Sequence, residues 1–464
     1  MKILGSYQKN IIRKIQTLID IAPHEWFRVW YLFLITFFFM VGHVFGHAII
    51  LASVTTTMGI YALPYFLIIA AVFAMVGTTV FARIIAKYDK PKLFVGLSLA
   101  AVVTLVAAYI VGDSHLYLFY SLVLLVVSVF QVQLHTILAL MKEHKFSPLE
   151  SQRTFPVIES SELLAGIVGG GVISLFIGHG FFAHYIHLSV NDFLLFWAGA
   201  LLLAVITHYV FLFFEKRQPV LVAAHEENEN LMHFTDSLQQ AYKYFSENKF
   251  LRNIAFFVFL QFAVFQAFEF LYTFYLSSHD DSHGESILHG LGYYVFITSI
   301  IGIFLQVFVS SFISKKLGVV KNLLLHPFLT LPVGFLMQFQ FSQGSVIGAK
   351  GMFDVTKQIA KNAYMSSLYA IPDNIRQLAK PFLDGFVAQL GIIFSTGFLI
   401  LFELFLHDHV TLAASIFINI LLFTMIIVLF YFREIYTGQV TMNLKNFSYS
   451  EEERFSFIEI LGQK

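Results

Sequence analysis

The sequence lacks cysteine altogether and is poor in charged residues. Without cysteine, disulfides, thiol catalysis and thiolate metal sites are excluded. Charged residues make up 12% of the 464 residues and the formal net charge is zero, so no attraction to nucleic acid is expected. The sequence also has no phosphate-binding glycine loop, no Ser/His/Asp set and no zinc-binding helix motif. We therefore predict neither an enzyme nor a cofactor-binding protein.

Hydrophobic residues, in contrast, make up 58% of the chain, with 55 phenylalanines among them. Apolar runs of about twenty residues recur throughout, and each is long enough to cross a bilayer as a helix. The first residues are polar, with neither an apolar core nor a cleavage site, and we predict no signal peptide. The sequence thus predicts an all-α membrane protein of twelve spans, near 29–52, 61–82, 93–111, 117–140, 153–178, 191–214, 251–276, 289–313, 319–341, 344–371, 381–405 and 410–432.

Lysine and arginine are confined to alternate loops, which predicts the orientation. The loop at 83–92 and the central loop contain lysine and arginine, whereas 112–116 and 277–288 contain no Lys or Arg. We therefore expect both termini in the cytoplasm. The central loop separates two sets of six spans with weakly similar loops, as in the major facilitator type. The predicted parts are an N-terminal segment, a first six-helix bundle, the central loop, a second bundle and a tail, at 1–28, 29–214, 215–250, 251–432 and 433–464.

The tenth predicted span carries four charged residues at spacings that place them on one helix face. They are Lys350, Asp354, Lys357 and Lys361. A charge at membrane depth costs about 2.5–3.5 kcal/mol, so such groups face a protein interior or a water-filled space. Asp354 cannot pair with all three lysines, which indicates a polar pathway that attracts an anion. A structural ladder of ion pairs and an amphipathic cytoplasmic helix remain alternatives.

Polar residues also lie in the first, fourth and seventh spans, which predicts a central cavity lined by every third helix. His43 and His47, one turn apart, could bind an anion and carry protons, or form hydrogen bonds between helices. Gln131 and Gln266 complete the predicted substrate-binding set. Glu269 is a candidate for proton coupling, a partner for the lysine stripe across the two halves, or half of a structural ion pair.

Further charged residues are candidates for coupling or gating. Glu159 and Glu162 lie one turn apart and could share a proton, but we expect them near the cytoplasmic end and solvated. We expect the loops at 83–92 and 314–321 to act as cytoplasmic latches, where Arg153 and Arg376 could pair with carboxylates. The donor-rich loop from His279 to His289 could hold a transition metal, but a solvated loop explains the same residues and we predict no metal site.

Two stretches resemble a known family. LYAIPDNIRQLAKPFLDGFVAQLG resembles the start of the eleventh helix in the ATP/ADP translocase-like (nucleotide transporter) branch of the major facilitator superfamily. QRTFPVIESSELLAGIVGG and FDVTK are similar to that family's fifth and tenth helices. The matching residues of the first stretch are Tyr369, Pro372, Arg376, Ala379, Lys380, Asp384, Gly385 and Gly391, and those of the second are Arg153, Phe155, Pro156, Gly166, Gly169 and Gly170.

The resemblance implies a multi-pass transporter of a bacterial inner (plasma) membrane that works by alternating access. It also brings Lys380 and Asp384 into the set of coupling or gating residues, which Arg83 of the loop at 83–92 completes. ATP as substrate is not implied, because His43 and His47 replace the charged cluster of the family's first helix, and Ile392 follows Gly391 where the family has lysine. We predict a carrier of a small organic anion, such as a nucleotide or another phosphorylated metabolite. A proton-coupled exporter and a non-transporting scaffold or sensor are the alternatives.

Overall fold

The structure is a computed structural model of a bundle of long membrane helices. It describes residues 21–22, 25–146, 148–178, 180–186, 188–215, 245–278, 284–306, 311–368, 370–371 and 373–446. In this part of the chain, eleven helices are long and apolar enough to cross a membrane. The charged helix α13 (Gln343–Leu368) joins them as the twelfth span. The predicted all-α architecture of twelve spans is confirmed.

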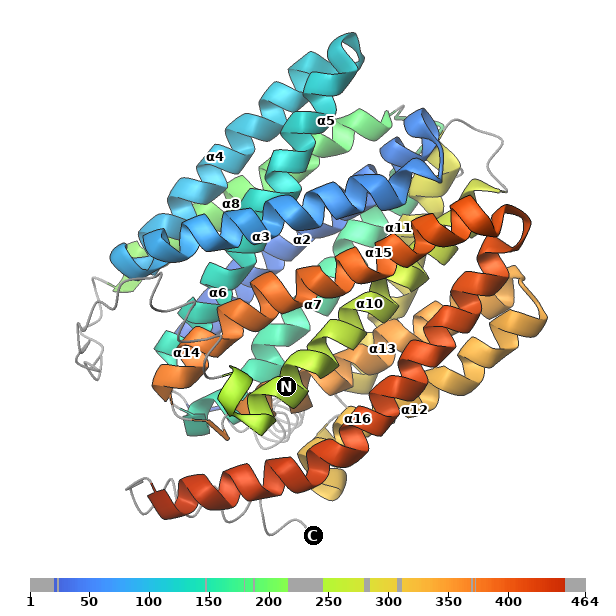
Figure 1. Ribbon diagram of the computed structural model, residues 1–464. Helices are drawn as coiled ribbons and strands as arrows, with labels where there is room; N and C mark the ends of the chain where they lie inside the picture. The colour runs from blue at the N-terminus through green and yellow to red at the C-terminus, as the bar shows by residue number, and fades with distance from the viewer. Residues whose placement is uncertain are drawn as a thin grey trace, which may run out of the picture.

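The helices form two groups of six, which lie side by side in Figure 1. The first bundle contains α2 (Trp26–Met58), α3 (Ala62–Lys87), α4 (Lys90–Val111), α5 (Leu116–Leu125) continued by the π-helix η2 (Val126–Gln131) and α6 (Val132–Lys145), α7 (Pro148–Phe176) and α8 (Phe193–Glu215). The second contains α10 (Lys249–Ser277), α11 (Glu285–Phe304), α12 (Ser311–Phe339), α13, the run α14 (Asp373–Phe382), π-helix η5 (Leu383–Val387) and α15 (Ala388–Phe405), and α16 (Val410–Asn446).

Several helix ends follow from local chemistry. Pro148 begins α7 and Pro91 lies in the first turn of α4, where its missing N–H costs nothing. The Asn248 side chain caps α10 by accepting from the Phe250 amide at 2.8 Å. At the other end of the chain, α16 continues to Asn446, beyond its predicted end near 432. Its last turns bend away from the span and run along the lower end of the molecule (Figure 1).

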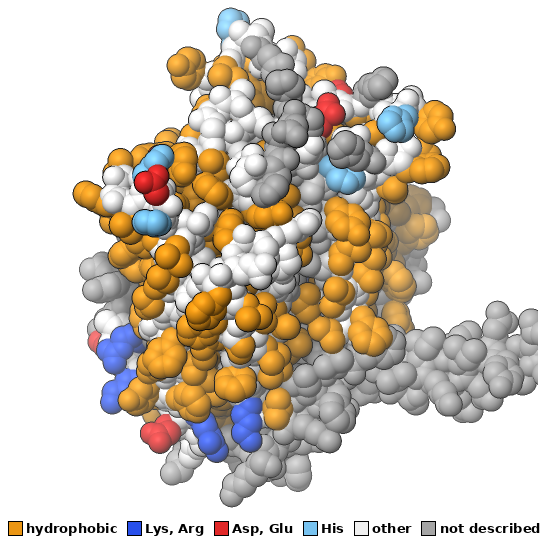
Figure 2. Space-filling view, turned by 90° about the vertical axis from the view of Figure 1, so that its right-hand side faces the viewer, with side chains coloured by type: hydrophobic (Ala, Val, Ile, Leu, Met, Phe, Trp, Pro, Cys, Tyr) orange, Lys and Arg blue, Asp and Glu red, His pale blue; other side chains and the backbone are white. Residues whose placement is uncertain are grey.

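The outer surface matches a membrane environment. Apolar side chains such as Val103 and Ile110 of α4 are exposed to 69% and 76%. Figure 2 shows a broad band of hydrophobic side chains, with lysine and arginine gathered at the lower end and histidines at the upper end. Apolar side chains suit contact with lipid, and a helix can lie there because its backbone hydrogen bonds are satisfied internally. The cytoplasmic location of the basic end stays a prediction.

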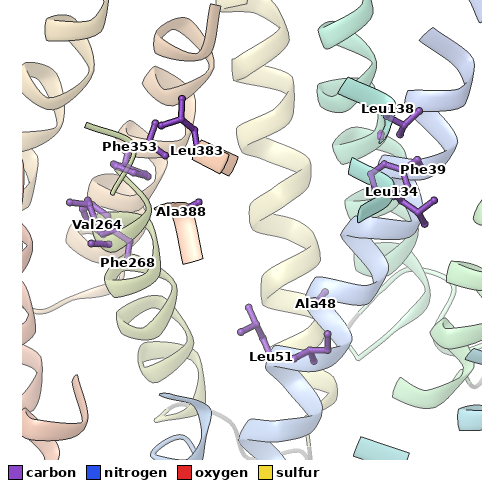
Figure 3. Close-up of a cluster of buried hydrophobic side chains, with 14 of the residues drawn as sticks. Phe39, Ala48, Leu51, Leu134, Leu138, Val264, Phe268, Phe353, Leu383 and Ala388 are labelled. Carbon is purple, nitrogen blue, oxygen red and sulfur yellow. The ribbon is translucent and has the colours of Figure 1, made fainter. Parts of the chain in front are cut away.

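Glycines set how closely the helices of the first bundle pack. Gly42 and Gly46, one turn apart on α2, leave room for the buried indole of Trp197 on α8. A Cβ atom at Gly46 would lie 2.6 Å from that ring. Apolar clusters fill both bundles, and Figure 3 shows part of them: Phe39, Leu134 and Leu138 on α2 and α6, and Val264, Phe268 and Phe353 on α10 and α13.

The two bundles meet along two helix pairs, α7 with α11 and α3 with α15. The first contact is made backbone to backbone. A Cβ atom at Gly170 would lie 2.6 Å from the Gly292 carbonyl oxygen and 2.7 Å from the Phe296 nitrogen. Small residues permit this approach in membranes. Charged side chains from α2, α7, α10 and α13 face one another between these helix pairs, and they form the candidate site.

Candidate functional site

The first half of α13 contributes one ion-pair cluster. Lys350 Nζ lies 2.8 Å from Glu269 Oε1 of α10 and 2.6 Å from Asp354 Oδ2 one turn along its own helix. The Tyr294 hydroxyl of α11 donates to Asp354 Oδ2 at 2.6 Å. From the other bundle, His47 Nε2 approaches Glu269 Oε2 to 3.4 Å. We call Lys350, Glu269, Asp354, Tyr294 and His47 the Lys350 cluster.

Glu269 was predicted as a partner of the lysine stripe across the two halves, and this is correct only in part. It pairs with Lys350, but α10 and α13 belong to the same bundle. The link between bundles at this level is the approach of His47 on α2 to the same carboxylate. Sequence spacing identifies both charged groups, but which helices are neighbours depends on the bundle topology.

The second half of α13 contributes a cluster that joins the two bundles. Lys361 Nζ pairs with Glu159 Oε2 and, at 2.8 Å, with Glu162 Oε2, both on α7. Lys142 Nζ of α6 lies 2.6 Å from Glu159 Oε1. We call Lys361, Glu159, Glu162 and Lys142 the Lys361 cluster. It lies about 16 Å along α13 from Lys350, at 1.5 Å per helical residue.

The expectation that Glu159 and Glu162 are solvated is wrong. Their side chains are exposed to only 9% and 10% because lysines of two helices cover them. Lys142 follows the fourth predicted span at 117–140, yet it lies in α6 and is 7% exposed. The helix continues to Lys145, and this extension places Lys142 against Glu159.

Lys357 lies between the two clusters and differs from its neighbours. Among the described residues no carboxylate lies within ion-pair distance of its ammonium group. Its Nζ instead faces aromatic rings of α10, 4.0 Å from the Phe265 centroid and 5.7 Å from that of Phe262. It is also close enough to His43 and His326 to interact with them electrostatically. Lys357 and both rings are half-buried, so part of each side chain is not covered by protein.

The first bundle supplies neutral polar groups opposite this lysine. Gln131 Nε2 contacts His43 Nδ1, and the rings of His43 and His47 stack with centroids 5.9 Å apart. Gln131 ends the π-helix Val126–Gln131, a local widening that is frequent at functional sites. The structure thus brings His43, His47 and Gln131 to the same region as the lysine stripe.

The remaining predicted site residues belong to neither the Lys350 cluster nor the Lys361 cluster. Gln266 is buried on α10. Lys380 and Asp384 lie where α14 meets η5, and the Tyr364 hydroxyl is 3.5 Å from Asp384 Oδ1. Arg376 lies on α14, a helix that contributes no residue to the Lys350 cluster or the Lys361 cluster. The side chains of Arg83 and Arg153 and the residues 279–283 of the outer loop lie outside the described part of the chain. Tyr294 and Phe265 were not predicted, because aromatic residues are common in every span.

The two bundles contact each other near both ends of the molecule. Near one end, His289 of α11 contacts the Ile177 carbonyl at 3.2 Å, and the rings of Tyr61 and His407 lie 5.5 Å apart. Toward the other end, Gln306 Nε2 donates to the Pro156 carbonyl at 3.0 Å, and the Lys361 cluster bridges α7 and α13. Contacts between the bundles therefore lie on both sides of Lys357 along the molecule.

Comparison with known proteins supports the fold. No protein-family model matches the sequence, and no curated protein matches it significantly. Among solved structures, the chain resembles the human organic anion transporter MFSD10 (TETRAN), with a TM-score of 0.60 and 13% identity over 88% of this chain and 100% of that one. The resemblance to the ATP/ADP translocase-like branch stays a prediction. The protein is thus an all-helical membrane protein with the fold of the major facilitator type, built from two six-helix bundles.

Proposed function

We propose that the protein is an alternating-access transporter of a small organic anion and that Lys357 binds the anion. The observation that carries this proposal is the contrast along α13. Lys350 and Lys361 each have two carboxylate partners, whereas Lys357 has none among the described residues. An unpaired ammonium at membrane depth is costly, so its presence indicates a function.

The environment of Lys357 suits reversible binding. Contact with the faces of Phe265 and Phe262 stabilises the free ammonium by about 0.5–2 kcal/mol, depending on how dry it is. A carboxylate partner in a water-free site would stabilise the ammonium more strongly than these rings do. An incoming anion can therefore compete with the rings for the lysine. His43 and Gln131 of the first bundle can then donate hydrogen bonds to the same anion from the opposite side.

The contacts that the clusters make between the two bundles support alternating access. The Lys361 cluster joins α13 to α7 of the other bundle, so it must break when the bundles separate at that end. His47 and Glu269 join α2 to α10 and must part when the opposite end opens. Rocking of two bundles around a midplane site is the general mechanism of such folds. Support for transport also comes from the structural neighbour, which is an organic anion transporter.

The test is uptake by proteoliposomes. Vesicles preloaded with ADP are offered labelled ATP, and a panel of labelled organic anions follows. Transport should be saturable, should fall to background in Lys357→Ala and should persist in part in Lys357→Arg, which keeps the charge. Lys321→Ala removes an exposed lysine of α12 and is the matched control.

The outcomes separate the alternatives. ATP uptake that requires internal ADP supports the nucleotide exchanger that the family resemblance implies. Uptake of other anions without ATP uptake supports a different organic anion. If no anion is transported and none stabilises the purified protein against heating, the proposal is overturned and a non-transporting scaffold or sensor is the better description.

A further inference from the structure

Among the described residues, the lysines and carboxylates along α13 and next to it balance one another. We call Lys142, Lys350, Lys357 and Lys361 with Glu159, Glu162, Glu269 and Asp354 the interface charge set. Four ammonium groups face four carboxylates, so the set has no net charge when the histidines are neutral. Inside a membrane protein this balance matters, because an uncompensated charge at low dielectric is expensive.

The balance is uneven along α13. The Lys361 cluster contains two lysines and two carboxylates and is neutral by itself. The Lys350 cluster contains one lysine and two carboxylates, and therefore has one excess negative charge. Lys357 supplies the compensating positive charge from about 10 Å along the helix axis. The Phe265 ring lies between them, 4.0 Å from Lys357 Nζ and 5.9 Å from Lys350 Nζ.

An anion bound to Lys357 would neutralise that lysine and leave the Lys350 cluster with its excess negative charge. A single proton would restore the balance. His47 and Glu269 are placed to hold it, because His47 Nε2 lies 3.4 Å from Glu269 Oε2 and has no hydrogen-bond partner. The Nε2 atom is buried although the His47 side chain is 36% exposed, so a proton held there is shielded from water.

The tyrosines and the lysine around Glu269 already have hydrogen-bond or ion-pair partners. The Tyr272 hydroxyl donates to the Gly290 carbonyl at 2.9 Å, and the Tyr294 hydroxyl donates to Asp354. Lys350 is paired with two carboxylates. The titratable and charged groups that face this carboxylate are His43 and His47 on α2, Tyr272 on α10, Tyr294 on α11, and Lys350, Asp354 and Lys357 on α13. Of these, His47 has a buried ring nitrogen that lies beside the carboxylate and makes no hydrogen bond in the described part of the chain.

The surroundings of Lys357 also limit the substrate. One unpaired lysine matches one negative charge, whereas a nucleotide would bring several. Phe262 and Phe265 offer apolar ring surface beside the ammonium group. Building on the proposed function, we propose that the site binds a monovalent organic anion with an apolar body at Lys357 together with one proton held between His47 and Glu269.

The experiment is calorimetric titration of the purified full-length protein in detergent. The probes are benzoate and octanoate, with succinate, citrate and ATP for comparison. Each titration is run in two buffers of different ionisation enthalpy, which gives the number of protons taken up. We expect the two monocarboxylates to bind with uptake of about one proton, and their Kd to rise about tenfold per pH unit at high pH, as one-proton linkage requires.

Glu269→Gln provides the second readout. The glutamine mimics the protonated carboxyl, so the variant should bind benzoate without proton uptake and with a Kd that no longer changes with pH. A merely structural role of Glu269 would instead weaken binding at every pH. Glu434→Gln, on the exposed side of α16, should keep the wild-type pH dependence.

The outcomes are distinct for the two proposals. Binding of a monocarboxylate that Lys357→Ala abolishes, but without proton uptake, overturns the proton site and leaves the proposed function standing. Preferential binding of ATP or citrate overturns the monovalent substrate class. If none of the five probes binds, both proposals fail.

Discussion

At the scale of single residues, Lys361 is the ammonium group that holds two carboxylates of the opposite bundle. Lys361→Ala leaves Glu162 without its cation and Glu159 with Lys142 alone. Removing one partner of a buried pair costs about 3–5 kcal/mol, and we expect less here because Lys361 is 27% exposed. The readout is the thermal unfolding temperature in detergent.

A double-mutant comparison tests the reason for that loss. Lys361→Ala combined with Glu162→Gln should unfold at a higher temperature than Lys361→Ala alone, because the uncompensated charge is gone. If the double variant is the less stable of the two, the pair is not what stabilises this part of the interface.

Gly46 gives a second prediction at the same scale. Gly46→Ala places a methyl group 2.6 Å from the buried ring of Trp197, and overpacking of this kind costs about 1–3 kcal/mol. Gly199→Ala, on the same helix as Trp197, meets nothing within 4 Å and should be neutral or slightly stabilising. Unfolding followed by tryptophan fluorescence should separate the two, and equal temperatures would contradict the packing argument.

At the scale of helices, the same substitution should act differently within a bundle and between bundles. Gly170→Ala pushes α7 away from the backbone of α11 in the other bundle, whereas Gly391→Ala pushes α15 into the Phe259 carbonyl within the second bundle. We expect the first to reduce transport with a modest effect on unfolding, and the second to lower the unfolding temperature clearly. Measuring both quantities for each variant tests the distinction, which fails if the two behave alike.

The sequence predicts the helices themselves, but not which side chains of neighbouring helices form pairs. Apolar length sufficed for the eleven spans of ordinary composition, and the spacing of four charged residues identified α13 as a polar helix inside the membrane. The partners of those charges could not be predicted, because they depend on helix neighbours. Lys350 meets Glu269 within its bundle and Lys361 meets α7 of the other, although both lie on one stripe.

The burial of individual charged side chains was the second feature that the sequence could not predict. Glu159 and Glu162 follow a polar stretch, and sequence alone favoured solvation. Their burial comes from Lys361, which is distant in the sequence. Lys357 could be selected as a candidate from its position. That it has no carboxylate partner among the described residues depends on where the neighbouring carboxylates point.

At the scale of the whole molecule, the absence of cysteine makes a direct test of bundle motion possible. A Cβ atom at Gly385 would lie 3.2 Å from Thr78 Cβ, across the contact between α3 and the second bundle. Disulfides need about 3.5–4.5 Å between these atoms, so a small shift permits one. Thr78→Cys with Gly385→Cys should lose transport on oxidation and recover it on reduction.

The matched control lies within one bundle. Val44→Cys with Gly169→Cys joins α2 to α7, where a Cβ atom at Gly169 would lie 3.1 Å from Val44 Cβ. Because both helices belong to the first bundle, oxidation should leave transport largely intact. If both disulfides stop transport equally, the two bundles do not move as separate bodies.

The balance of the interface charge set has a consequence for energised membranes. Each elementary charge carried across a membrane potential requires about 2.3 kcal/mol per 100 mV. Because four lysines are matched by four carboxylates, rocking of the bundles in the proposed transport cycle would carry no net charge of this set through the electric field. The protein's return after releasing a solute should therefore proceed at the same rate in polarised and depolarised cells.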